Sequence, residues 1–202
     1  MLFDQHGNRK YMIEREWRAF LATADAAEPD TRSFCWMLAR SGGRLSEVLA
    51  LTPRSIDLEN GTIRIRCLKR RATNIYREVP IGPGFLELLD TTVSIAGRRI
   101  DPLQIDVPIW EWCRTTGWQR MKEVALSAGL PNNLCMPKAL RHTFGIEGVL
   151  MQGIPLGTMQ KWMGHARLES TVIYTTPVGR EERLLEERMW NRPGCPIDLE
   201  RA

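Results

Sequence analysis

The spacing of apolar residues in the first fifty positions is typical of amphipathic helices. A helix is predicted over about 13–26 from apolar residues at three- and four-residue intervals, namely Ile13, Trp17, Phe20 and Leu21. A second helix is expected from Thr31 to the glycine pair that follows Ser41. A third is expected from about Leu45 until Pro53, because proline disfavours helix in the residue before it.

The pattern then changes to the two-residue period of β-strands. Residues 55–58 and 62–66 alternate apolar with polar side chains, and the Asn60-Gly61 pair between them is a strong hairpin signal. Residues 75–81 alternate in the same way before a Gly-Pro-Gly turn. We therefore predict a small antiparallel sheet of three strands inserted into a helical protein.

Helical spacing resumes after the third predicted strand. Helices are predicted near 85–89, near 118–126, and over about 138–152, 156–162 and 180–190, each closed by glycine or proline. No segment has the composition of a linker. The sequence therefore predicts a mainly α fold with a small three-stranded antiparallel sheet (α+β), as one domain over residues 1–202.

Composition is that of a globular protein in a reducing compartment. The chain is 43% hydrophobic and 26% charged, and no stretch approaches the roughly 18 consecutive apolar residues of a membrane span. The first residues carry no secretory signal. The five scattered cysteines have no C-x-x-C spacing, which favours free thiols in a cytoplasm over disulfides or zinc.

Basic residues are concentrated in the segment of the predicted sheet. The net charge of +4 permits a nucleic acid partner without requiring one. The segment is either a solvated hairpin or a phosphate-binding surface, and its basic residues are Arg64, Arg66, Lys69, Arg70, Arg71 and Arg77.

Two arginines occupy positions suited to an oxyanion. Arg44 begins a predicted helix after two glycines, where free backbone N–H groups favour an anion, and Arg141 lies inside a predicted helix beside His142. A guanidinium stays protonated and forms paired, charge-assisted hydrogen bonds to phosphate. Two of them would stabilise a phosphodiester under attack by an oxygen nucleophile.

Tyr174 is the candidate nucleophile, nine residues after His165. A tyrosine with its ordinary pKa of about 10 needs cationic neighbours or a base to act in this way. An isolated tyrosine is more often a half-buried aromatic, so the joint pattern carries the hypothesis. Lys69, between the second and third predicted strands, is either the proton donor for the leaving oxygen or a plain phosphate contact.

The chain resembles the catalytic domain of the tyrosine recombinase (phage integrase) family over about residues 10–190. The resemblance rests on five fragments in order, which are Gly43–Leu51, Lys69 with Arg77–Ile81, Leu140–Gly145, Trp162–His165 and Ile173-Tyr174. Each fragment is moderately common. All five in this order form a specific signature.

The resemblance implies a role for each matched residue. Tyr174 would attack the scissile phosphate, form a 3′-phosphotyrosyl link and release a 5′-hydroxyl. Arg44 and Arg141 would clamp the phosphate, Lys69 would act as general acid, and His165 would hydrogen-bond the phosphate. Glu47 would orient the site. The link conserves bond energy, so neither a metal nor another cofactor is expected.

The sequence departs from the family pattern at two points. Lys138 stands where the family usually has histidine, three residues before Arg141, which leaves the source of base assistance to Tyr174 open. Only 43 residues precede Arg44, so we expect no preceding helical DNA-binding domain. The chain is either a naturally short recombinase or an excised domain.

The expected partners are double-stranded DNA and other copies of the chain. The resemblance implies tetramers on paired sites in a bacterial cytoplasm, associated with the nucleoid. The apolar spacing after Tyr174 fits packing either on a neighbouring protomer or on the chain's own core. Two alternative functions share these residues: relaxation of DNA like a type IB topoisomerase, and a non-catalytic DNA-binding regulator.

Overall fold

The structure is a computed structural model that describes residues 2–67, 75–176 and 180–190. A short hairpin with a bridge between Phe3 and Arg9 precedes the first helix. The elements then follow in the order α1 (Glu14–Asp25), α2 (Pro29–Ser41), α3 (Leu45–Leu49), η1 (Pro53–Ser55), β1 (Ile56–Asp57), β2 (Thr62–Arg66), β3 (Tyr76–Pro80), α4 (Pro83–Val93), α5 (Ile95–Ile100), α6 (Arg114–Ser127), α7 (Pro137–Ile146), η2 (Glu147–Met151), α8 (Leu156–Met163), α9 (Glu169–Val172), η3 (Ile173–Thr175) and α10 (Arg180–Trp190).

The predicted fold class is confirmed. The three strands form one antiparallel sheet in the order β1-β2-β3, with Ile56 opposite Ile63 and Ile63 opposite Val79. These residues are buried while their neighbours along β2 and β3 are partly or fully exposed, as the two-residue period predicts. The sheet therefore turns its apolar face to the helices and its charged face to the surface.

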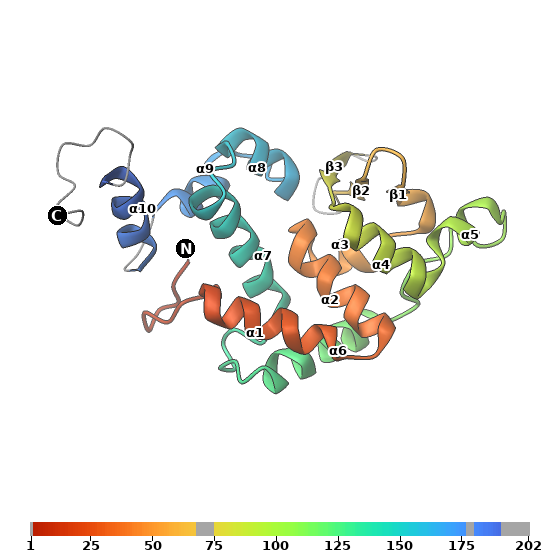
Figure 1. Cartoon of the computed structure of the whole chain (residues 1–202), viewed down its shortest axis with the longest axis horizontal. Helices are drawn as coiled ribbons and strands as arrows, with labels where there is room; N and C mark the ends of the chain where they lie inside the picture. The colour runs from red at the N-terminus through yellow and green to blue at the C-terminus, as the bar shows by residue number, and fades with distance from the viewer. Residues whose placement is uncertain (1, 68–74, 177–179, 191–202) are drawn as a thin grey trace, which may run out of the picture.

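Helix α2 lies at the centre of the fold. It packs against α1, α4, α6 and α7, and Figure 1 shows α7 crossing the middle of the molecule between α2 and the α8–α9 segment. Its buried side chains belong to the main apolar core, together with the inner residues of the sheet. Figure 1 shows α8 beside the sheet, where it contacts β3.

A second apolar cluster lies beside α7 and includes Tyr174. Its buried members are Leu2, Tyr11, Ile146, Leu150, Met159, Met163 and Tyr174. Leu185 of α10 packs against this cluster, whereas Met189 is exposed. The last described helix thus rests partly on its own chain, which is one of the two arrangements that its apolar spacing allows.

Several boundaries differ from the prediction. The helix expected over 138–152 ends at Ile146 and continues as the π-helical turn η2. Helix α5, α9 and η3 were not predicted. Along the part of the chain that the structure describes, no helix is both long and apolar enough to cross a membrane.

Candidate active site

Arg44 is placed by the tight turn between α2 and α3. Gly42 ends α2 with φ of 58°, and a Cβ there would lie 2.5 Å from the ring of Phe144. Glycine suits both the positive φ and the close approach. The chain then turns at once into α3, where the Nη1 of Arg44 donates to Oε1 of Glu47 at 2.8 Å.

Glu47 is a buried carboxylate that holds two arginines. Its side chain is 2% exposed, and Oε2 accepts from Nη2 of Arg77 at 2.8 Å and from the backbone N–H of Arg44 at 3.0 Å. Burial raises the pKa of Glu47, but the hydrogen bond and charge of Arg77, with help from Arg44, hold that pKa below its ordinary value. The carboxylate is therefore ionised and fixes the direction of Arg44.

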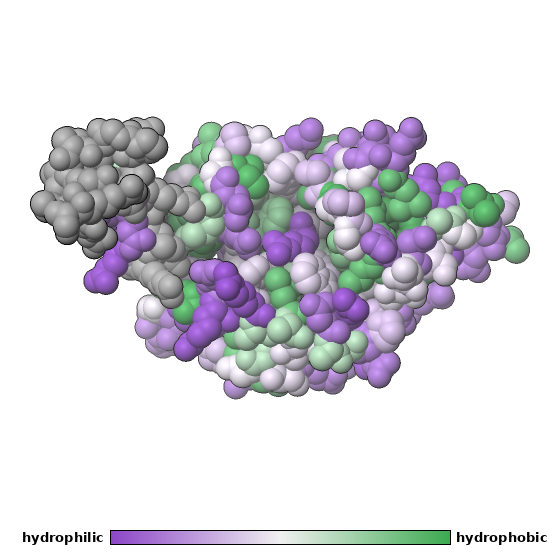
Figure 2. Space-filling view, in the orientation of Figure 1, coloured by the Kyte–Doolittle hydropathy of each residue, from purple (hydrophilic) through white to green (hydrophobic). Residues whose placement is uncertain are grey.

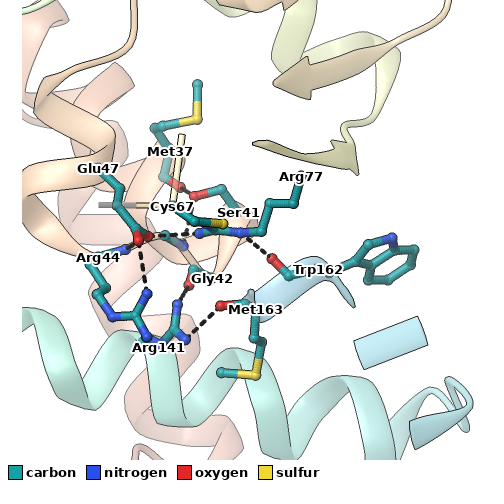
Figure 3. A network of polar contacts seen from close by, with 11 residues as sticks. Met37, Ser41, Gly42, Arg44, Glu47, Cys67, Arg77, Arg141, Trp162 and Met163 are labelled. Atoms are coloured by element: carbon teal, nitrogen blue, oxygen red, sulfur yellow. Dashed lines mark hydrogen bonds and ion pairs between the residues drawn. The ribbon is translucent and has the colours of Figure 1, made fainter. Parts of the chain in front are cut away.

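Arg77 corrects the sequence-based expectation of a surface phosphate contact. Its side chain is buried, and besides Glu47 it donates from Nε to the carbonyl of Trp162 at 2.7 Å and from Nη1 to Sγ of Cys67 at 3.3 Å (Figure 3). The sequence held the signal, because Arg77 shares the two-residue register of buried Val79 on β3. Arg77 is an internal brace of the site.

Arg141 projects from α7 into the same network. Its Nη1 donates to the carbonyl of Gly42, and its Nη2 donates to the carbonyl of Met163 at 2.7 Å. Burial, and next the charge of Arg44, lower the pKa of Arg141 to about 10, so it remains charged at neutral pH. The guanidinium groups of Arg44 and Arg141 lie side by side in Figure 3. Two adjacent cations that have one carboxylate, Glu47, beside them favour the binding of a further anion such as phosphate.

The end of α8 is held by both buried arginines. Trp162 and Met163 supply two of its last carbonyls, which lack partners within the helix, and Arg77 and Arg141 donate to them. Gly164 follows with φ of 63°, and a Cβ there would lie 3.0 Å from the Arg77 side chain. This arrangement places the next residue, His165, close to the arginines.

His165 and Tyr174 face each other across the short segment that joins them. Nδ1 of His165 lies 2.8 Å from Oγ1 of Thr171, and its ring stacks on Tyr174 with centroids 6.3 Å apart. Burial, then Arg141 and Arg44, lower the pKa of His165 to about 4, so the imidazole is neutral at neutral pH. Burial raises the pKa of Tyr174 to about 12 although the same arginines lower it.

His142 contacts Tyr174, and the sequence did not predict this contact. Its Nδ1 lies 3.0 Å from the hydroxyl oxygen of Tyr174. The only signal in the sequence was its position beside Arg141, which says nothing about a residue 32 positions away. The contact exists because α7 packs on η3.

The remaining predicted residues lie around this centre or outside the described residues. Lys138 is exposed in the first turn of α7, one turn before Arg141 and His142, and after burial its charge is the next cause that lowers the pKa of His142. Lys69, Arg70 and Arg71 lie outside the described residues.

Arg64 and Arg66 are exposed on the outer face of β2, as predicted. Arg64 pairs with Glu78 at 3.2 Å. An open groove of about 640 Å³ connects both arginines with Glu47 and with the exposed side chain of Tyr76. The groove thus joins the exposed arginines of β2 to Glu47, the carboxylate that contacts Arg44 and Arg77. Figure 2 shows a second feature, a hollow near the centre of one face, where hydrophilic side chains gather between the α7–α8 side and the sheet side.

The comparison with protein families agrees with this site. Residues 10–179 match the family model described as the phage integrase family, and the chain belongs to that family. The chain is 25% identical over 188 residues to the tyrosine recombinase XerD of Haemophilus influenzae, and 28% identical over 158 residues to XerD of Yersinia pestis. The first alignment covers 91% of this chain and 63% of that relative, and the second covers 75% and 51%.

Solved structures show the same fold. A XerA recombinase matches with a TM-score of 0.73 and 22% identity, covering 91% of this chain and 64% of that one. The catalytic domain of bacteriophage HP1 integrase matches with a TM-score of 0.61 and 21% identity, covering 90% and 94%. A XerH recombinase bound to its difH substrate matches with a TM-score of 0.65 and 21% identity, covering 94% and 60%. The chain thus spans less than two thirds of most of these relatives and nearly all of an isolated catalytic domain.

Proposed function

We propose that this chain is the catalytic domain of a site-specific DNA recombinase that cleaves and rejoins strands through a 3′-phosphotyrosyl intermediate. The observation that carries the proposal is the convergence of Arg44, Arg141, His165 and Tyr174. They come from four segments of the chain and meet around two adjacent guanidinium groups. Membership in the phage integrase family supports the same assignment.

Each group has a defined task in the proposed reaction. The hydroxyl oxygen of Tyr174 attacks the phosphorus, its proton passes to solvent water, and the bond to the 5′-oxygen breaks. Arg44 and Arg141 stabilise the charge on the nonbridging oxygens. Neutral His165 donates a hydrogen bond to the phosphate, Lys69 protonates the 5′-oxygen, and Lys138 adds positive charge. Glu47 does not react and keeps Arg44 in place. Religation reverses these steps, so no metal or nucleotide is consumed.

Duplex DNA is the proposed partner. The exposed arginines of β2 support it, as does the fact that a XerH recombinase and a Tn1549 transposon integrase of the same fold were solved with DNA. We further propose that residues 1–202 form one catalytic domain, that the protein acts in the bacterial cytoplasm on nucleoid DNA, and that four copies assemble on paired sites.

The decisive experiment is covalent capture on suicide DNA, in which a nick lets the 5′ product diffuse away. Tyr174→Phe should abolish the adduct and leave DNA binding nearly intact, because the ring can still pack where the hydroxyl cannot attack. Persistent adduct in this variant would identify another nucleophile. Absence of adduct in the parent protein on every family site tested would favour a non-catalytic regulator. Relaxation of plasmids that lack any recognition site would favour a topoisomerase.

A further inference from the structure

Tyr174 lies in a closed pocket. Its side chain is 1% exposed, and its ring stacks on His165 on one side. On another side it contacts α7, where a Cβ on Gly145 would lie 2.7 Å from the ring. Gly145 follows His142 by three residues, so both face the tyrosine from the same side of the helix. Because Gly145 has no side chain, the Tyr174 ring can pack directly against α7.

His142 holds the polar end of this pocket. It is 7% exposed, and its Nδ1 lies 3.0 Å from the Tyr174 hydroxyl. Its Nε2 is buried and has no hydrogen-bond partner in the part of the chain that the structure describes. The contact with Tyr174 is therefore the polar interaction that orients this imidazole.

The enclosed hydroxyl is not positioned for attack. A nucleophilic oxygen must approach phosphorus to about 3–3.5 Å in line with the leaving group. The scissile phosphate is part of a duplex and cannot enter a pocket whose tyrosine is 1% exposed. Tyr174 must therefore move before it reacts.

We propose that His142 is a positioning residue that holds Tyr174 in this pocket, so that the hydroxyl reaches the scissile phosphate only after their hydrogen bond breaks. This inference rests on the proposed role of Tyr174 as nucleophile.

A role for His142 in holding Tyr174 explains the contact between the two side chains better than a role in proton transfer does. An imidazolium at His142 would bury a charge whose Nε2–H has no acceptor among the described residues, and such a charge is costly. Burial, then Lys138, with smaller effects from Arg141 and Lys10, lower the pKa of His142 to about 4. Neutral His142 next to a protonated Tyr174 is a stable resting pair.

The segment that carries Tyr174 is held mainly by side-chain packing. It consists of the 3-10 turn η3 after α9, a helix of four residues. Three of these four, Glu169, Ser170 and Val172, are exposed. A helix this short has little stability of its own, so its position depends on side chains such as that of Tyr174.

Nitration by tetranitromethane without DNA tests the pocket independently of recombination. The chain has three tyrosines, and peptide mapping separates exposed Tyr76 from buried Tyr11 and Tyr174. In the parent protein Tyr174 should react far more slowly than Tyr76. His142→Phe removes the hydrogen bond and should speed nitration of Tyr174 by roughly two- to tenfold, the equivalent of one ordinary hydrogen bond. His142→Asn, whose amide replaces Nδ1, should restore protection.

Gly145→Ala is the second variant and leaves His142 intact. The new Cβ would displace the Tyr174 ring, so nitration of Tyr174 should also rise. Unchanged nitration in both His142→Phe and Gly145→Ala would overturn the proposal. Equal nitration in His142→Phe and His142→Asn would also overturn it, because packing alone would then explain the effect. If thermal unfolding shows that His142→Phe is not folded, unchanged nitration of Tyr174 in Gly145→Ala alone would overturn the proposal.

The rate of covalent capture separates holding from catalysis. With holding, His142→Phe should form the adduct on suicide DNA about two- to tenfold faster than the parent protein. A slower rate in a folded His142→Phe variant would assign His142 to proton transfer and overturn the proposal. If the parent protein forms no adduct at all, the proposed function fails, while nitration still reports whether His142 holds Tyr174.

Discussion

At the scale of single residues, the site depends on a buried carboxylate between two arginines. Glu47 is 2% exposed and contacts both Arg44 and Arg77. A buried charge is tolerated when its lone pairs are filled by fixed donors, and here three N–H groups fill them. The same contacts that keep Glu47 ionised keep Arg44 directed at its neighbour, Arg141. Stability and the proposed phosphate recognition are therefore linked at Glu47.

Arg77→Ala should lower the free energy of unfolding by roughly 3–5 kcal/mol, because it leaves the charge of Glu47 buried with fewer donors. The matched control is Arg64→Ala on the neighbouring strand. Arg64 is exposed and pairs with exposed Glu78, so its loss should cost about 1 kcal/mol or less. Urea denaturation of both variants measures the difference.

A second comparison separates lost charge from lost packing in that prediction. Glu47→Gln combined with Arg77→Met removes both charges and keeps most of the volume. The double variant should be more stable than Arg77→Ala, since no buried charge is left without its partner. Equal losses in the two would mean that packing of Arg77, and not the charge of Glu47, dominates.

His142 should make stability depend on pH. Its pKa is lowered to about 4 in the folded state by burial and then by Lys138, Arg141 and Lys10, against about 6.5 when unfolded. The unfolded chain therefore binds the proton first as the pH falls. The contribution is fully present above pH 6.5 and is lost as the pH falls towards 4, by up to about 3 kcal/mol.

The check is urea denaturation between pH 7 and pH 4, before carboxylates dominate. His142→Phe should flatten the fall, while His165, whose pKa is also lowered to about 4, continues to contribute in the same direction. An unchanged slope in His142→Phe would show that His142 titrates with an ordinary pKa in the folded protein.

The sequence predicted some site residues and not others, for a physical reason. Arg44, Arg141, His165 and Tyr174 were predicted because reaction chemistry requires their functional groups and because their order along the chain resembles that of the tyrosine recombinase family. His142 and the internal role of Arg77 depend on which elements pack together. No local spacing encodes those contacts, although strand alternation would have put Arg77 on the buried face.

At the scale of elements, α7 carries Arg141 and His142, and its end shows why boundaries were mispredicted. The apolar spacing continues past Ile146, so a single helix was expected. A Cβ on Gly148 would collide with Met159 of α8, which shows how closely η2 and α8 approach. Helix α5 was missed because Ser94, with φ of 51°, breaks the helix that leads into it. Both deviations come from tertiary packing or backbone strain, which the pattern of apolar residues does not report.

Substitution of Lys138 tests whether the first turn of α7 contributes to catalysis. A cation near a helix N-terminus is unfavourable for the helix dipole, so Lys138→Ala should leave stability unchanged or slightly raised. Cleavage should nevertheless slow by about ten- to a thousandfold, in the range for losing one electrostatic or acid–base group. Single-turnover capture on suicide DNA measures the rate.

Lys138→His is the matching rescue, because histidine is the usual residue at this position in the family that the chain resembles. It should recover part of the lost rate. Cleavage at the parent rate in Lys138→Ala would show that Lys138 is an exposed charge with no role in the reaction.

At the scale of the whole molecule, positive charge is unevenly distributed. The chain has a net charge of only +4, and several arginines are internal or paired. Arg64 and Arg66 lie on the open face of the sheet, beside the groove that leads to Glu47. Figure 1 shows helix α1 across the molecule from this sheet. Binding of duplex DNA should therefore depend on the sheet face and not on total charge.

The salt dependence of DNA affinity measures how this positive charge is used in binding. Each phosphate contact that binds DNA contributes about 0.9 to the slope of log affinity against log salt. Arg64→Gln with Arg66→Gln should flatten the slope by up to about two, less if Glu78 already neutralises part of Arg64. Arg15→Gln with Arg18→Gln is the charge-matched control, because both arginines are exposed on α1 and the double variant also removes two charges. It should leave the slope unchanged. Equal flattening by Arg15→Gln with Arg18→Gln would show that DNA senses net charge alone, and the sheet would then have no special part in binding.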